Sequence, residues 1–190
     1  MHFEHNDKTK ELINLVGDFI EQRVRPREQE YSDEMTAFRE DGNPWQVPKV
    51  LRELKNEAKD LGLWNFSLTG QSGYGLSNTE FAPLAEMMGV GWTSEVFNSS
   101  APDAGNMEVL DKYGSDYQKE EWLKPLLNGE IRSAFAMTEP NVASSDATNI
   151  SSTITLDGDE YVLNGEKWWT SGYGRPDCEF MIFMGVSNPE

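Results

Sequence analysis

The sequence predicts an α+β fold, in which an all-helical N-terminal domain is followed by the start of an antiparallel β-domain. Apolar residues recur at helical spacing along the first part of the chain. After Gly129 the apolar residues fall instead into short segments of the kind that form strands. Residues typical of turns and helix caps separate these segments. The 190 residues are enough for one or two domains with buried cores.

The first helix is expected over residues 9 to about 31, because its apolar residues share one face that can be buried. Pro26 lies inside this stretch. Because proline lacks an N–H and clashes with the preceding turn, we expect it to bend or interrupt the helix. The apolar positions of this helix are Leu12, Leu15, Val16, Phe19, Ile20 and Val24.

Further helices follow, each marked by residues that favour its ends. Pro48 suits the first turn of a helix, and Gly62 suits the left-handed residue that ends one. A capping-box pattern begins at Ser77, where a hydroxyl and a glutamate three residues later can satisfy unpaired N–H groups. Two shorter helices are then expected over residues 104–113 and 117–127.

Strands are expected in the last part of the chain. Residues 157–159 (DGD) join the first two strands, and Asn164-Gly165 supplies a two-residue hairpin turn, since both residues tolerate positive φ. The four predicted strands cover residues 151–156, 161–163, 166–171 and 180–186.

The composition is that of a globular protein, with 37% hydrophobic and 26% charged residues. The 33 acidic residues outnumber the 16 basic ones and give a formal net charge of −17. A surface this negative repels phosphate backbones and anionic membranes, so we expect no nucleic-acid partner. No apolar run approaches the roughly 20 residues that a membrane-spanning helix needs, so no membrane insertion is expected.

Cys178 is the only cysteine, so the chain has no internal disulfide and suits a reducing compartment. The first residues are polar and charged and lack the features of a signal or transit peptide, which predicts a cytoplasmic protein. The two histidines, His2 and His5, both lie near the N-terminus. No zinc-ligand spacing and no credible Ser–His or Cys–His pair exists, so we expect neither a metal site nor a nucleophilic site.

One stretch that could form a binding site covers residues 135–146, where an apolar strand enters a Thr-Glu-Pro corner at residues 138–140. Small and hydroxylated residues follow it. A loop of this kind lets backbone N–H groups approach a polar ligand, with hydroxyls as adaptable donors. Taken alone, the corner is better explained as a plain turn.

A second stretch covers residues 167–172, KWWTSG. Two indoles beside two hydroxyls and a glycine could form a flat aromatic wall with polar edges, which suits a flavin ring. In a strand, alternation would place one indole on each side, so at most one of Trp168 and Trp169 would touch a ligand. The alternative is that both indoles serve only as core residues.

At these residues the sequence resembles the acyl-CoA dehydrogenase family. The most specific segments are residues 134–140 (AFAMTEP) and 164–169 (NGEKWW), which occur in the family's order and separation. Residues 101–108 (APDAGNME) and 143–150 (ASSDATNI) look like the branch that includes human family members ten and eleven. The resemblance covers nearly the whole chain.

The resemblance implies an N-terminal helical domain over residues 1–133 and a partial middle β-domain over residues 134–190 that carries the flavin-binding motifs. The family's C-terminal helical bundle would be absent. In the family that bundle holds the glutamate that removes the α-proton. We therefore expect no catalytic residue in this chain and expect the chain alone to be inactive.

The implied function is that of an FAD-dependent oxidoreductase of fatty acid metabolism. The complete enzyme would oxidise an acyl-CoA thioester to the trans-2-enoyl-CoA, pass a hydride to flavin N5 and deliver electrons to an electron-transferring flavoprotein. Met137 and Thr138 would form hydrogen bonds to the flavin ring, and Trp169 would lie against that ring. Ser145 would also contact the substrate. The implied cofactor-binding residues are Phe135, Met137, Thr138, Ser144, Ser145, Trp169, Thr170 and Ser171.

The sequence departs from the wider family in two places. Ser171, expected near N5, stands where many members have threonine, and the loop after Pro140 carries one extra residue, which shifts the placement of Ser144 and Ser145. A homo-oligomer is expected for the complete protein. The alternative is a non-catalytic module that uses the remnant fold to bind a full-length relative.

Overall fold

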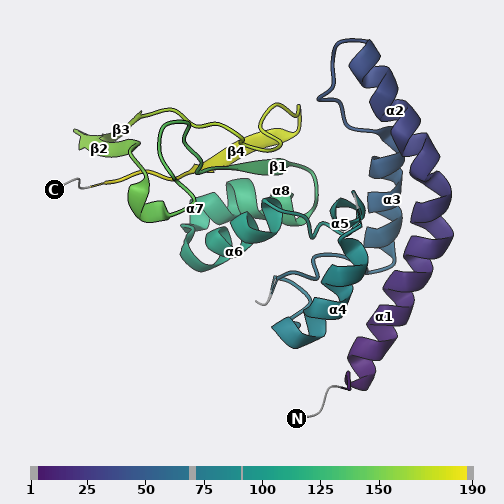
Figure 1. Ribbon diagram of the computed structural model, residues 1–190. Helices are drawn as coiled ribbons and strands as arrows, with labels where there is room; N and C mark the ends of the chain where they lie inside the picture. The colour runs from purple at the N-terminus through teal and green to yellow at the C-terminus, as the bar shows by residue number, and fades with distance from the viewer. Residues whose placement is uncertain (1–3, 69–71, 91, 188–190) are drawn as a thin grey trace. The chain divides into compact units, whose positions relative to one another are not determined.

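A computed structural model describes residues 4–68, 72–90 and 92–187 (Figure 1). The chain divides into two compact units, the first ending at Ile131 and the second beginning at Arg132. The described residues of the first unit form helices and the segments between them, whereas the second unit contains strands. This order confirms the α+β class expected from the periodicity.

The first helical stretch is irregular near its proline and longer than expected. Pro26 lies in a single turn of 3₁₀-helix that follows a π-helical turn, because the proline offers no N–H to the regular ladder. The chain nevertheless stays helical to Glu40, beyond the expected end near residue 31. The segments are α1 (Asp7–Phe19), the π-helical turn (Ile20–Val24), the 3₁₀ turn (Arg25–Arg27) and α2 (Glu28–Glu40).

The later helices begin and end largely where their caps indicated. Pro48 precedes α3, Gly62 adopts a φ of +73° just beyond it, and Ser77 forms the expected capping box with Glu80. The four-residue α5 was not expected, because it is too short to show a helical period. The elements are α3 (Lys49–Asp60), α4 (Asn78–Met88), α5 (Thr93–Val96), α6 (Asp103–Tyr113), α7 (Asp116–Gln118), a π-helical turn (Lys119–Leu123) and α8 (Lys124–Leu127).

The core of the helical unit is aliphatic and aromatic. Phe97 is fully buried, and its ring meets that of Phe19 edge to face with centroids 5.6 Å apart. Helix α1 packs against α4, and α3 packs against α5. The other fully buried side chains of this core include Val16, Val50, Leu54, Ala58, Leu84 and Val96.

In the strand unit, β2 (Thr153–Asp157) and β3 (Glu160–Asn164) form the expected antiparallel hairpin. Its turn contains Gly158, whose φ of +61° suits a glycine. The hairpin is solvent-exposed along most of its length, with Tyr161 and Leu163 among its exposed side chains.

The other strand pair differs from the antiparallel arrangement expected from the sequence. Strands β1 (Arg132–Ala136) and β4 (Cys178–Phe183) pair in parallel and lie side by side in Figure 1. A parallel pair needs a long crossover, and the segment from residue 137 to residue 177 provides one. The hairpin rule applies only to strands that follow each other closely, so it could not predict this pairing.

Residues 166–171 do not form the strand expected for them, and Asn164-Gly165 is not a hairpin tip. The strand β3 ends at Asn164, and the chain then runs on without regular structure. The backbone of Gly165 lies so close to Ser152 that a Cβ there would be 2.1 Å from the Ser152 Oγ. Glycine is required here by close packing, which a sequence pattern does not distinguish from a turn.

Across the described part of the chain, every helix is too short or too polar to cross a lipid bilayer.

Candidate functional site

The strand unit brings the two motif segments together. The backbone N–H of Trp168 donates to the carbonyl of Thr138 at 3.0 Å. The Nζ of Lys167 donates to the carbonyl of Met137 at 2.9 Å. The Thr-Glu-Pro corner and the double-tryptophan segment are therefore neighbours in space, although about thirty residues separate them.

A hollow of about 340 Å³ opens beside this junction. Its walls come from the ends of β1 and β4 and from the segment that follows β3. Trp169 and Thr170 were expected at a cofactor site, whereas Tyr173, Met181 and Phe183 were not singled out. The lining residues are Ala136, Lys167, Trp168, Trp169, Thr170, Tyr173, Met181 and Phe183.

Both indoles line this hollow, contrary to the expectation that alternation would separate them. The reason is that their segment is not a strand, and Trp169 adopts a φ of +53°. Positive φ is uncommon for a bulky residue and concentrates at functional sites. The two ring systems lie 5.5 Å apart at 55°, and 79% of Trp169 is exposed. Together the indoles form an accessible aromatic wall.

Glu139 is buried in the strand unit, with 3% of its surface exposed. Its Oε2 accepts from the Ser151 N–H at 2.9 Å and from the Ser151 hydroxyl at 2.6 Å. Its Oε1 accepts from the Ser152 N–H at 2.9 Å and from Lys167 Nζ at 2.7 Å. The Lys167 ammonium, with these serines, holds the pKa of Glu139 well below its usual range. The carboxylate therefore stays ionised and is a poor proton acceptor.

Lys167 is the partner that the sequence did not identify. Its side chain is 8% exposed and its Nζ lies 5.0 Å from the centroid of the Phe183 ring. A buried ammonium needs several partners to offset the loss of hydration, and it has them in Glu139, Met137 and Phe183. No spacing rule links residues 139 and 167, so only the fold shows the pair.

The remaining predicted residues do not line the hollow. Ser144 is buried and its hydroxyl oxygen accepts from the Glu139 N–H at 2.7 Å, so in this structure it ties the loop to itself. Ser145 and Ser171 are exposed. Phe135, Met137 and Thr138 are partly buried in and after β1.

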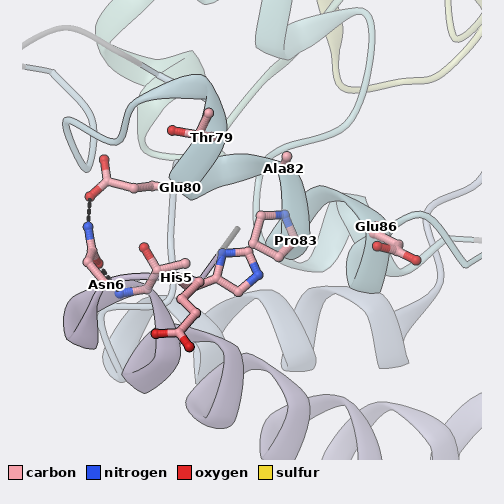
Figure 2. Close-up of a pocket in the computed structure, with 9 residues that line it drawn as sticks. His5, Asn6, Thr79, Glu80, Ala82, Pro83 and Glu86 are labelled. Atoms are coloured by element: carbon pink, nitrogen blue, oxygen red, sulfur yellow. Dashed lines mark hydrogen bonds between the residues drawn. The ribbon is translucent and has the colours of Figure 1, made fainter. Parts of the chain in front are cut away.

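A second hollow lies in the helical unit, between the start of α1 and α4 (Figure 2). It measures about 580 Å³, and Asn6 and Glu80 meet across it through a hydrogen bond of 2.8 Å. Hydrogen bonds from Ser77 lower the pKa of Glu80 to about 2, and Glu4 and Glu86 add further carboxylates. Such a lining repels anionic ligands and contains none of the predicted residues, so the candidate site is the hollow in the strand unit.

The described residues contain no group of three or more histidine, cysteine, aspartate or glutamate side chains arranged to hold a metal ion.

Comparison with known proteins defines the class of this fold. Residues 6–130 match the model of the acyl-CoA dehydrogenase N-terminal domain, and residues 134–190 match that of the acyl-CoA dehydrogenase middle domain. The chain belongs to the acyl-CoA dehydrogenase family.

Individual relatives agree with this assignment. FadE2 of Mycobacterium tuberculosis, assigned as an acyl-CoA dehydrogenase, is 47% identical over all of this chain and 46% of its own length. Human acyl-CoA dehydrogenase family member 11 is 46% identical over 96% of this chain and 23% of its own length. The match to family member 11 confirms the expected branch of the family.

A solved structure assigned as an acyl-CoA dehydrogenase from Mycobacterium abscessus superposes with a TM-score of 0.91 and 49% identity. The superposition covers 98% of this chain and 48% of the chain in the solved structure. The chain thus spans about half the length of FadE2 and of this structure, and less of family member 11.

Proposed function

We propose that this chain forms the N-terminal helical part and the first flavin-contacting part of an FAD-dependent acyl-CoA dehydrogenase. The observation that carries the proposal is the hollow in the strand unit, where the double-tryptophan segment lies against the Thr-Glu-Pro corner. Its relatives bear acyl-CoA dehydrogenase names, which supports the reaction class.

The chemistry of the hollow fits a flavin ring. The ring is flat and aromatic, with a polar edge, and such ligands favour apolar aromatic walls with a few directed polar groups. Trp168, Trp169 and Phe183 supply the aromatic surface, and Thr170 supplies a hydroxyl at the same hollow. The volume of about 340 Å³ lies in the range of small-molecule sites.

Each predicted residue takes a role in this proposal. The carbonyl oxygens of Met137 and Thr138 already accept from Lys167 and Trp168, so we assign the Met137 N–H and the Thr138 hydroxyl to the ligand. Trp169 would shield one side of the ligand from water. When bound, FAD would supply the hydride acceptor for oxidation of an acyl-CoA thioester to the trans-2-enoyl thioester.

Further assignments concern the edges of the site. Phe135 and Thr170 would flank the cofactor, and Ser171 would place a hydroxyl near its reacting edge. Ser144 would support the loop from inside, as its bond to Glu139 suggests, and Ser145 would face the cofactor's phosphates or the acyl-CoA. Donors near a position where negative charge develops stabilise that charge.

We assign no residue of this chain to proton removal. Glu139, the buried carboxylate beside the hollow, is held ionised by Lys167, Ser151 and Ser152 and is a poor base. The chain alone is therefore expected to be inactive in the reaction. For the complete protein we propose an electron-transferring flavoprotein as electron acceptor, a homo-oligomeric assembly and a cytoplasmic location.

The test is the visible absorption spectrum of the purified chain, recorded with and without added FAD and after desalting. We expect a retained flavin spectrum, and we expect Thr138→Val to weaken retention by removing a donor to the ring. The exposed strand residue Thr155 offers a matched control, because Thr155→Val makes the same change away from the hollow. A colourless protein would overturn flavin binding by this chain and favour a module that binds a full-length relative.

A further inference from the structure

One ion pair joins three separate segments of the strand unit. Glu139 belongs to the corner after β1, Ser151 and Ser152 precede β2, and Lys167 follows β3. The carboxylate of Glu139 receives four hydrogen bonds, two on each oxygen, from the other two segments. Its acceptor capacity is therefore occupied by donors that lie far apart in the sequence.

The lysine extends this connection to the wall of the hollow. Lys167 Nζ contacts Glu139 Oε1 at 2.7 Å and the Met137 carbonyl at 2.9 Å, so one ammonium binds the corner and the residue that precedes it. The same ammonium lies over the ring of Phe183 in β4. The neighbouring Trp168 N–H then bonds the Thr138 carbonyl at 3.0 Å.

We infer that the Glu139–Lys167 pair is a positioning device that sets the spacing between residues 137–139 and residues 167–170. Lys167 and Glu139 act through their neighbours, because the groups assigned to the ligand belong to other residues, among them Met137, Thr138 and Trp169. The inference rests on the proposed function where it predicts flavin affinity. The part of the inference that concerns the contact between the two segments does not depend on any ligand.

The effect of the Glu139–Lys167 pair can be measured at a single backbone amide, that of Trp168. If Lys167 holds the two segments together, the hydrogen bond from Trp168 N–H to Thr138 O should open more often when the ammonium is removed. Hydrogen exchange measures such local opening directly. A role confined to overall stability would instead change the exchange of every slowly exchanging amide in the strand unit to a similar extent.

The experiment uses the 190-residue chain with Lys167→Met, which keeps most of the side-chain volume, and with Lys167→Arg, which keeps the charge. In the Met variant we expect the Trp168 amide to exchange at least about tenfold faster, with the amides of α3 unchanged. The dissociation constant for FAD, measured where both proteins are fully folded, should rise at least about tenfold. The Arg variant should recover part of both effects.

Lys124→Met is the matched control, because Lys124 forms an exposed ion pair with Glu120 in the helical unit. It should change neither readout. Unchanged Trp168 exchange in Lys167→Met would overturn the inference, whatever happens to FAD. If the Trp168 amide exchanges faster in Lys167→Met but the wild-type chain binds no FAD, the positioning role is upheld and the flavin assignment is overturned.

Discussion

Each of the two units of the molecule is stabilised internally by a different kind of contact. The helical unit buries an apolar core in which Phe97, Leu54 and Val16 have at most 1% of their surface exposed. The strand unit leaves most of its β2–β3 hairpin in solvent, and it buries the Glu139–Lys167 ion pair. Apolar packing tolerates many sequences of similar volume, whereas a buried ion pair depends on particular donors and acceptors. The candidate site lies in the unit that depends on particular residues.

The largest expected effect concerns the apolar core. Phe97→Ala should lower the free energy of unfolding by about 3–5 kcal/mol, because it removes a fully buried ring and leaves a cavity beside Phe19. Urea denaturation followed by far-UV circular dichroism measures the loss. Leu163→Ala is the comparison in the hairpin, where the side chain is 53% exposed, and it should change stability by less than about 0.5 kcal/mol. Equal losses would remove the contrast between the units.

The next prediction concerns pH. The folded pKa of Glu139 is depressed by Lys167 and the serines, so the stability that this carboxylate contributes is present above its unfolded pKa and is lost as the pH falls toward the folded value. The stability of the strand unit should therefore decline from about pH 4.5 downward, near the ordinary glutamate pKa.

Glu139→Gln tests this assignment, because the amide keeps the shape and cannot titrate. Chemical denaturation at a series of pH values should show a shallower decline in the variant than in the wild type. Glu160→Gln in the exposed hairpin is the control and should leave the wild-type slope in place. Identical slopes for wild type and Glu139→Gln would contradict the depressed pKa.

A smaller effect is expected at Gly165. An alanine Cβ would lie 2.1 Å from the Ser152 Oγ and 2.9 Å from its Cα, so Gly165→Ala should destabilise the chain by about 1–3 kcal/mol. It should also disturb the Ser152 N–H that bonds Glu139. Gly105→Ala in α6 makes the same change with no atom within 4 Å of the new Cβ, and it should stabilise by about 0.5–1 kcal/mol. Thermal melts that show the same sign for both would refute the close-packing argument.

The helices could be predicted from the sequence because their determinants are local. The spacing of apolar residues identified the buried faces, and Pro48, Gly62 and Ser77 marked the ends of elements where the structure has them. Helix α5 and the extension of α2 to Glu40 escaped prediction. The first is too short for periodicity, and the second has no buried residue to mark it.

The strand unit could be predicted only where its contacts are local. The β2–β3 hairpin follows from a glycine turn between two short segments. The parallel pairing of β1 with β4 and the irregular path of residues 165–170 depend on contacts across long stretches of chain. For that reason the expectation that the two indoles lie on opposite sides was wrong, and both line one hollow.

The family, the order of helices and strands and the two motif segments follow from the amino-acid sequence, because short-range spacing and side-chain type can be recognised along the chain. Which groups come into contact depends on the folded arrangement of the chain. Folding brings Lys167 into hydrogen-bond contact with Glu139 and Met137. It also gives Trp169 a positive φ, with its indole in the lining of the hollow. Such contacts depend on distances between residues far apart in sequence, and these distances exist only after the chain has folded.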